Sequence, residues 1–346
     1  MIRLPATQNA SADLVHLFRQ GLAGSRLSAG ESAIIYADTF TTPQYPAAFL
    51  AAARDLGADA FQIVQPMIPF DLARGIGRAR PSPLMIEAMK GADLVIDLTT
   101  GGMLYSNEQT AILAAGTRIL RVREPEDCLL RMLPSEEIRS RAVRGTERLS
   151  QARQVRLASA DGTALVMDKT GRPITTQYGM ADEPGRWDHW PTGLICTAPI
   201  EETVEGVLVI TPASIVFPFE TYVTEPILLR FEKGVATSIE GGREAIMLND
   251  LVNRGDRNSR RLAHIGWGLE HRARWDTLAT RGWDNGGGVE SRSICGGVLV
   301  ALGENRDLGG ANAATLHIDI SLRGTVLELD GEPIVENGRF IATELA

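Results

Sequence analysis

The sequence is poor in cysteine and has no long apolar run. Its three cysteines, Cys128, Cys196 and Cys295, are too few and too widely spaced for a disulfide framework or a Cys-x-x-Cys metal site. We therefore expect them to be small buried apolar residues. No segment approaches the roughly 20 apolar residues needed to span a bilayer, and the N-terminus has no apolar signal core. These absences favour a cytoplasmic protein without membrane contact.

Basic charge is also in short supply. The 35 Lys and Arg residues are outnumbered by 43 Asp and Glu residues, which gives a formal net charge of −8. Binding along a nucleic-acid backbone needs clustered basic residues that displace counterions from phosphates. The composition therefore argues against nucleic acid as a partner, and the apolar fraction of 44% is that of an ordinary globular protein.

The first half of the chain has the rhythm of an α/β domain. Short β-rich runs alternate with amphipathic helical stretches, as in βαβ units around a parallel sheet. The expected strands and helices are Ser32–Tyr36, Pro46–Leu56, Ala60–Gln65, Pro83–Lys90, Ala92–Leu98, Asn107–Ala114 and Arg118–Val122. We expect residues 1–150 to form a Rossmann-like domain with a structural and oligomer-forming role.

The second half has a different pattern. Short alternating runs are interrupted by Gly, Pro and Asp, which indicates an antiparallel, strand-rich α+β domain over residues 151–346. The expected strands include Val155–Ala160, Thr163–Asp168, Gly206–Ile210, Ile227–Glu232 and Thr325–Leu329. Pro134–Arg153, rich in Glu and Arg, is expected to be a solvated linking helix, so the predicted boundary lies near residue 150.

Histidine is informative because there are only five. His16 is expected at a partly buried helix position, and His271 at the surface or beside a site. His317 and Asp319 share one face of a predicted strand, with apolar neighbours on the other. By itself, such a pair is more often hydrogen-bonded on a half-exposed strand than bound to a metal.

His264 strengthens the metal interpretation. It lies in the apolar, glycine-flanked segment Leu262–Leu269, where an unpaired imidazole would be costly to bury. Two neutral imidazoles and one carboxylate form a facial triad with open cis positions, whereas four ligands in a closed tetrahedron would indicate structural zinc. We therefore expect His264, His317 and Asp319 to hold one divalent ion in a catalytic C-terminal domain.

The densest group of unusual residues is the Pro- and Gly-containing segment Tyr178–Gly193. Two tryptophans, several charges and a histidine suit a loop over a bound ring, and a surface loop pinned by its own aromatic residues is the alternative. In the functional interpretation His189 exchanges protons, since its reference pKa lies near neutrality. The candidate substrate contacts are Glu183, Arg186, Trp187 and Trp190.

Three segments resemble a known enzyme family. Tyr178–Gly193 with ADEPGRWDHWPTG, Leu262–Leu269 with HIGWGL, and Leu316–Ile320 within HIDISLR resemble the 2,5-dihydroxypyridine 5,6-dioxygenases of bacterial nicotinate breakdown, which are relatives of aminopeptidase T-type metallopeptidases. The resemblance extends over nearly the whole chain. It implies a non-haem Fe(II) enzyme that cleaves a hydroxylated N-heteroaromatic ring with O₂ in an extradiol-type reaction. It also implies iron ligands at the same two histidines and aspartate that the pattern selects.

Two positions depart from those dioxygenases, which have a histidine at the place of Tyr105 and a glutamate at the place of Gln177. A tyrosine, with a reference pKa near about 10, donates a hydrogen bond but cannot replace a histidine as a base at neutral pH. Gln177 keeps the shape of a glutamate without its charge. We take Tyr105, Gln177 and His189 as candidate catalytic residues and expect a related ring with a different substituent or a different proton inventory.

A metal-dependent hydrolase is the alternative function. It would be aminopeptidase-like or an aromatic aminohydrolase, with Zn²⁺ or Mn²⁺ activating water. The resemblance speaks against a two-metal aminopeptidase, because Leu194 and Leu299 stand where those enzymes carry ligands. A metal-free binding protein is a third possibility. The expected partners are a small aromatic substrate, O₂ and further copies of the same chain.

Overall fold

The computed structural model divides the chain into two compact units. It describes residues 7–68, 79–104, 106–217, 219, 221–282, 288–342 and 345, with the backbone alone for residues 7–12. Among these residues, the first unit consists of residues 7–68, 79–135 and 178–191, and the second of residues 136–177 and 192–345. Tyr105, one of the candidate catalytic residues, lies outside the described residues.

The chain passes between the units more than once, so a single boundary near residue 150 does not describe it. Helix α6 (Glu136–Gln151), expected as a linker, belongs to the second unit, and Tyr178–Pro191 belong to the first. The reason is strand β8 (Trp187–Trp190), which pairs in parallel with β4 (Arg118–Val122) and extends the first sheet. The segment expected as a loop therefore contains a sheet strand.

The first unit is built on a five-stranded parallel sheet with the order β2-β1-β3-β4-β8. This confirms the predicted parallel α/β architecture, in which each pair of parallel strands is joined by a crossover. Besides β4 and β8, its elements are α1 (Thr7–Gly24), β1 (Ser32–Asp38), α2 (Tyr45–Asp55), β2 (Asp59–Gln65), α3 (Pro83–Lys90), β3 (Leu94–Asp97), α4 (Asn107–Ala114) and α5 (Glu126–Arg131).

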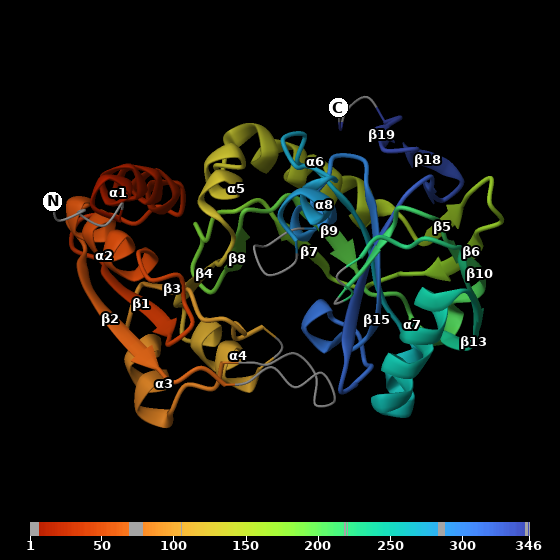
Figure 1. Cartoon of the computed structure of the whole chain (residues 1–346), viewed down its shortest axis with the longest axis horizontal. Helices are drawn as coiled ribbons and strands as arrows, with labels where there is room; N and C mark the ends of the chain where they lie inside the picture. The colour runs from red at the N-terminus through yellow and green to blue at the C-terminus, as the bar shows by residue number, and fades with distance from the viewer. Residues whose placement is uncertain are drawn as a thin grey trace, which may run out of the picture. The chain divides into compact units, whose positions relative to one another are not determined.

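Helices cover both faces of this sheet, and strand β1 shows why. Its side chains alternate: Ala33, Ile35 and Ala37 belong to a core shared with α1, α2 and α5, whereas Ile34 and Tyr36 belong to a core shared with α3 and α4. Figure 1 shows α1 and α2 on one side of the strands and α3 on the other. A parallel strand buried on both faces reads as a continuous apolar run, as β1 does in the sequence.

Local signals fix the helix ends. Ser82 precedes α3 and accepts a hydrogen bond from the Met85 backbone N–H, and Ser106 does the same for the Gln109 N–H at the start of α4. Gly116 follows α4 with φ +95°, a left-handed conformation that favours glycine. These short-range interactions explain why both helices have the predicted bounds.

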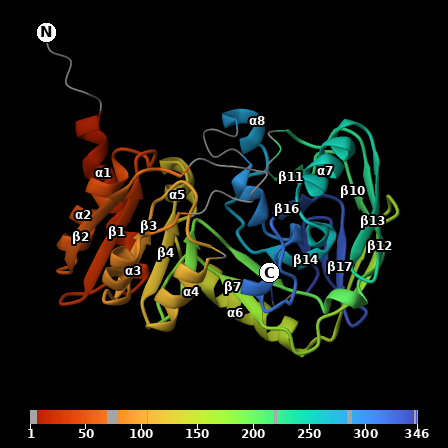
Figure 2. The ribbon, with the colours of Figure 1, turned by 90° about the horizontal axis from the view of Figure 1, so that it is seen from below.

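The second unit contains two antiparallel sheets (Figure 2). The eight-stranded sheet has the order β13-β12-β10-β6-β5-β17-β18-β19, and the six-stranded sheet the order β11-β16-β15-β14-β9-β7. Their strands are β5 (Gln154–Ala158), β6 (Ala164–Asp168), β7 (Ile174–Gln177), β9 (Leu194–Thr197), β10 (Glu205–Ile210), β11 (Ile215–Val216), β12 (Ile227–Glu232), β13 (Val235–Gly241), β14 (Leu262–Gly268), β15 (Val298–Gly303), β16 (His317–Leu322), β17 (Val326–Leu329), β18 (Glu332–Glu336) and β19 (Arg339–Phe340). The strand-rich second half is thereby confirmed.

Helix α6 packs directly on the six-stranded sheet. A Cβ atom added at Gly145 would lie 2.3 Å from Ile195 Cδ1 on β9, so the helix approaches the strand at its glycine. The unit's other helices are α7 (Arg243–Arg254) and α8 (Thr277–Arg281), with 3₁₀ turns at Glu201–Thr203, Arg257–Arg260, Val289–Arg292 and Arg306–Leu308. The buried side of α6 explains why it belongs to this unit and is not a solvated linker.

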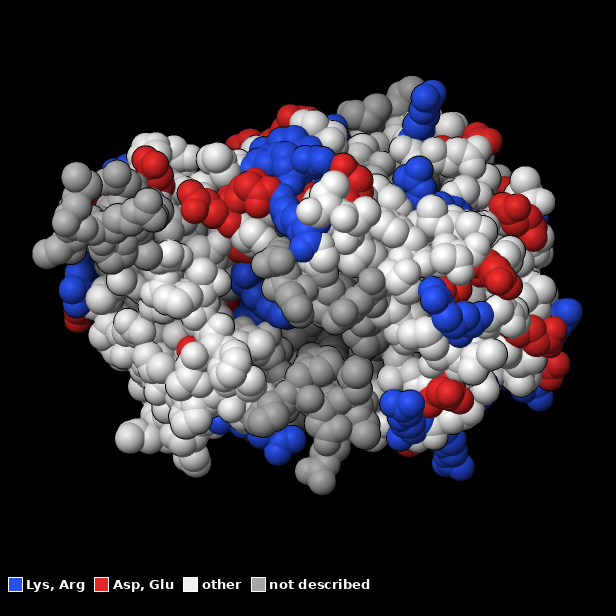
Figure 3. Space-filling view, in the orientation of Figure 1, with Lys and Arg blue, Asp and Glu red and all other residues white. Residues whose placement is uncertain are grey.

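Acidic and basic side chains are interspersed on the face shown in Figure 3, where basic groups lie beside acidic ones. Arg274 and Asp276 form an exposed ion pair, with N and O atoms 2.6 Å apart. No helix among the described residues has the length and apolar character required to cross a lipid bilayer. Of the three free cysteines, Cys128 and Cys196 are buried as expected, and Cys295 is only partly buried.

Candidate metal centre

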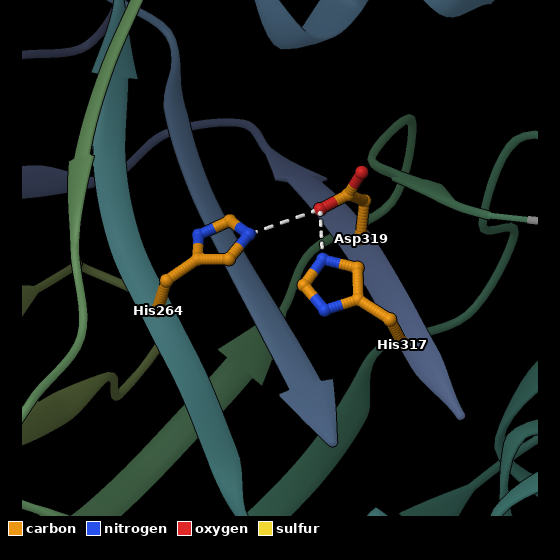
Figure 4. A group of neighbouring side chains, drawn as sticks. All are labelled: His264, His317 and Asp319. Carbon is orange, nitrogen blue, oxygen red and sulfur yellow. Dashed lines mark hydrogen bonds and ion pairs between the residues drawn. The ribbon is translucent and has the colours of Figure 1, made fainter. Parts of the chain in front are cut away.

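Two imidazoles and one carboxylate converge on one face of the six-stranded sheet. His264 lies on β14, and His317 and Asp319 lie two residues apart on β16, on the other side of β15. One ligand atom from each residue falls within 4.8 Å of the others. Asp319 Oδ1 is 3.2 Å from His264 Nε2 and 3.3 Å from His317 Nε2 (Figure 4). The geometric condition set by the sequence, convergence on a common point, is met.

The backbone fixes the tautomer of His317. Its Nδ1 lies 2.7 Å from the carbonyl oxygen of Glu304, which can only accept, so Nδ1 carries the proton. Nε2, which lies 3.3 Å from Asp319 Oδ1, is then the ring atom that can bind a cation. A buried amide pair holds the loop that carries Glu304: Asn312 donates to the Gly303 carbonyl, and the Asn305 side chain accepts from the Asn312 N–H. Metal-bound histidines commonly have such a carbonyl partner on the other ring nitrogen.

The protonation states of the other two residues also suit a cation. Burial lowers the pKa of His264 more strongly than Asp319 raises it, which favours the neutral imidazole. Burial alone would raise the pKa of Asp319, but hydrogen bonds from both histidines and the charge of Arg292 hold it well below its usual range. An ionised carboxylate between two imidazoles offers one anionic oxygen and two ring nitrogens to a single point, a combination that binds a divalent cation. The donor set therefore fits a metal ion.

Arg292 lies beside this group and was not among the residues predicted from the sequence. Its Nη1 donates to Asp319 Oδ2 at 3.1 Å, and its guanidinium lies 5.3 Å from the ring centre of Phe217. One carboxylate oxygen of Asp319 is therefore held by Arg292, which leaves Oδ1 for the two histidines. Arg292 comes from a 3₁₀ turn distant in sequence, so no local pattern marks it.

His189, the candidate proton-transfer residue, is paired in the first unit with a residue that the sequence analysis missed. Its Nε2 lies 2.9 Å from Glu124 Oε2, and Glu124 is almost fully buried after the end of β4, the strand next to β8. Burial would raise the pKa of Glu124, but His189, Arg121 and Arg123 outweigh it and lower the pKa to about 2. An ionised carboxylate thus faces His189. Charged residues at the carboxyl ends of neighbouring parallel strands were the available clue.

Residues 13–342 match the family model for NicX, 2,5-dihydroxypyridine 5,6-dioxygenase. The chain belongs to this dioxygenase family. It is 35% identical over 344 residues to the 2,5-dihydroxypyridine 5,6-dioxygenase of Pseudomonas putida KT2440, and this alignment covers 97% of the chain and 98% of that protein. The resemblance inferred from three sequence segments is confirmed, and with it membership of an enzyme family.

Solved structures agree with this assignment. The structure of 2,5-dihydroxypyridine dioxygenase from Pseudomonas putida KT2440 superposes with a TM-score of 0.90 at 34% identity, covering 97% of this chain and 99% of that one. Wild-type AmpT from Thermus thermophilus superposes with a TM-score of 0.64 at 17% identity, covering 96% and 99%. At that identity the likeness to AmpT concerns the fold alone.

In this dioxygenase-family chain, Trp190 requires a correction. It was expected as a possible stacking surface for a substrate ring. The structure instead buries it completely in the first core, where it lies edge-on to Phe18, its Nε1 donates to the Met132 carbonyl, and one ring edge fills the space next to Gly21. An indole enclosed in this way is a core residue, so Trp187 is the remaining stacking candidate.

The charged residues of the same segment hold it together. Asp188 accepts hydrogen bonds from the backbone N–H groups of Tyr178, Gly179 and His189. Arg186 pairs with Asp188 at 2.7 Å, and its guanidinium lies 3.9 Å from the centre of the Tyr178 ring. Through these bonds Asp188 fixes the backbone that carries His189.

The remaining candidate residues have other contacts in the structure or are exposed. Gln177, at the end of β7, accepts a hydrogen bond from the Thr192 hydroxyl at 3.1 Å. Glu183 is exposed. His16 is an exposed residue of α1 rather than a partly buried one, and His271 is exposed beside Glu137. The structure thus brings together the three metal-ligand candidates, and in the first unit it pairs His189 with Glu124.

Proposed function

We propose that this chain is a non-haem Fe(II) dioxygenase that opens the ring of 2,5-dihydroxypyridine or a closely related hydroxylated N-heteroaromatic. One observation carries the proposal: two imidazoles and one carboxylate converge within 4.8 Å in a chain of the 2,5-dihydroxypyridine 5,6-dioxygenase family. A set of three ligands on one face leaves coordination positions for a substrate hydroxyl and O₂. Affinity alone does not distinguish iron from zinc or manganese, and the choice of Fe(II) rests on the reaction class.

Each residue of the centre has a distinct task in this proposal. His264, His317 and Asp319 hold the ion, whose chemistry when bound is to polarise a substrate hydroxyl and keep it close to O₂. The Glu304 carbonyl keeps His317 in the tautomer whose Nε2 can coordinate the ion. Arg292 holds the second oxygen of Asp319, so that the carboxylate keeps its orientation when substrate enters.

We propose His189 as the group that moves a proton to and from the substrate. With its Nε2–H donated to ionised Glu124, its Nδ1 is left as an acceptor for a hydroxyl proton. Glu124 stabilises the imidazolium that results. Trp187 is proposed to stack on the ring, and Glu183 and Arg186 stay proposed as substrate contacts, Arg186 also through its bond to Asp188.

The departures at Tyr105 and Gln177 bear on which ring is accepted. Relatives with a histidine and a glutamate at these positions have one more base and one more negative charge for 2,5-dihydroxypyridine. We expect this chain to prefer a ring that does not need these two groups. Tyr105→His combined with Gln177→Glu is expected to shift kcat/KM toward 2,5-dihydroxypyridine over other hydroxypyridines. The measurement is the ratio of kcat/KM values across a hydroxypyridine panel, and an unchanged ranking in the double variant contradicts this account.

The direct test is oxygen uptake by Fe(II)-reconstituted protein supplied with hydroxypyridines. The expected result is consumption of one O₂ per ring opened, loss of the ring absorbance, and no turnover under argon. His317→Ala serves as the inactive control, and the exposed His271→Ala as the control that retains activity. Turnover that continues without O₂ would identify a metal-dependent hydrolase and refute the dioxygenase.

A further inference from the structure

Strand β15 separates His264 from His317 and Asp319, and its side chains are small where it passes between them. In the six-stranded sheet Ala301 on β15 is the direct partner of His264 on β14 and also of Asp319 on β16. Directly paired residues of antiparallel strands point to the same face. His264, Ala301 and Asp319 therefore form one row, with the alanine in the middle.

The distances show that the two outer side chains close over this alanine. Neighbouring strands lie about 4.8 Å apart, so β14 and β16 are separated by roughly 10 Å. Nevertheless, His264 Nε2 and Asp319 Oδ1 are only 3.2 Å apart. Both side chains must therefore lean inward above β15. The small side chain of Ala301 leaves room for them. Ala301 itself is completely buried.

The neighbouring positions of β15 show that small residues on this face are confined to Ala301 and Gly303. On the same face, Leu299 can be large because it is paired with Gly266 on β14. Gly303 is paired with His317, and its φ of +99° and the closeness of the Leu316 carbonyl exclude a side chain there. The opposite face carries Val300, with an ordinary core side chain. The sequence Leu-Val-Ala-Leu-Gly thus leaves a notch, formed by Ala301 and Gly303, below the triad.

We propose that Ala301 is a positioning residue of the metal centre: its methyl side chain provides the notch over which His264 and Asp319 converge, and a β-branched residue there holds them apart. This inference rests on the proposed metal function and identifies a determinant outside the ligand set. Gly303 is small for a backbone reason, so Ala301 is the position at which side-chain size controls the centre.

The test measures metal binding without turnover. Wild-type protein, Ala301→Gly and Ala301→Val are titrated with Co(II) against a competing chelator, and the visible spectrum of bound Co(II) reports its coordination. Val300→Ile adds bulk to the same strand on the opposite face and is the matched control. Thermal unfolding of each apoprotein checks that the fold is intact.

Ala301→Val is expected to weaken Co(II) binding by about 10- to 100-fold, the range typical when groups behind metal ligands are changed, and to alter the Co(II) spectrum. Ala301→Gly and Val300→Ile are expected to bind Co(II) like wild type. If the valine variant does not fold, Ala301→Thr has the same branched shape and replaces it. Wild-type affinity and spectrum in either folded branched variant overturn the inference, whereas absence of Co(II) binding by wild type itself refutes the proposed metal function.

Discussion

Asp319 is the residue on which the centre depends most, because its carboxylate contacts both histidines and Arg292. Replacing it with asparagine preserves the size of the side chain and removes the charge that complements a cation. We expect Asp319→Asn to lose metal affinity by more than the roughly 10- to 100-fold typical of changes behind the ligands. Metal content after dialysis and chelator competition measure the loss. The exposed Asp307→Asn is the matched control, and equal affinity in both variants would rule out Asp319 as a ligand.

The sequence predicted the metal-ligand candidates at residue scale but not the residues that support them. Period-2 alternation was sufficient to place His317 and Asp319 on one face, and the cost of burying a lone imidazole singled out His264. Glu304 contributes a backbone carbonyl, Arg292 comes from a 3₁₀ turn, and the role proposed for Ala301 depends on a small side chain. None of these features leaves a local pattern in the sequence. Trp190 was misjudged for a related reason, since an indole suited to stacking on a ligand suits a core equally well.

At the scale of elements, the predicted bounds were best where short-range signals act. α3 and α4 lie between a serine cap and a glycine or alanine end, and β4 is a continuous buried run, so all three were predicted without error. β8 was missed because four residues flanked by glycine and proline carry no strand signal of their own. It is a strand because it pairs in parallel with β4, about 65 residues earlier. A short stretch of sequence does not reveal such a distant partner.

The pairing of β4 with β8 brings Glu124 and His189 together, and this contact has a pH signature. Because the folded-state pKa of Glu124, about 2, lies below the ordinary value of 4.5, ionised Glu124 stabilises the fold above about pH 4.5. That contribution is lost as the pH falls toward 2, and it amounts to roughly 3 kcal/mol at most. Glu124→Gln should therefore lower the free energy of unfolding at pH 6 by about 1 to 3 kcal/mol, with a smaller difference at pH 3.

Urea unfolding at both pH values measures this difference. The exposed Glu126→Gln provides the control, for which we expect the same stability as wild type at both pH values. A deficit of Glu124→Gln that is equal at pH 6 and pH 3 would show that the side chain contributes through packing and not through its charge.

At the scale of the whole molecule, the expected homo-oligomer would be formed through the first unit. Strand β2 is at one end of its parallel sheet, and it exposes 44% of Phe61 and 52% of Val64. An exposed apolar edge strand is usually covered by another chain or blocked by charge. Neither residue contributes to the described contacts of the metal-ligand candidates, which all belong to the second unit.

We therefore expect the wild-type chain to be a homo-oligomer in light scattering coupled to size exclusion, and Phe61→Lys with Val64→Lys to shift it toward the monomer. Placing two lysines on the edge adds like charges that oppose association. Co(II) affinity should be unchanged in this double variant, because the ligands lie in the other unit. Leu84→Lys, at a position 81% exposed on α3, is the matched control and should leave the assembly intact. A monomeric wild-type chain, or a double variant with the wild-type mass, would refute β2 as the assembly surface.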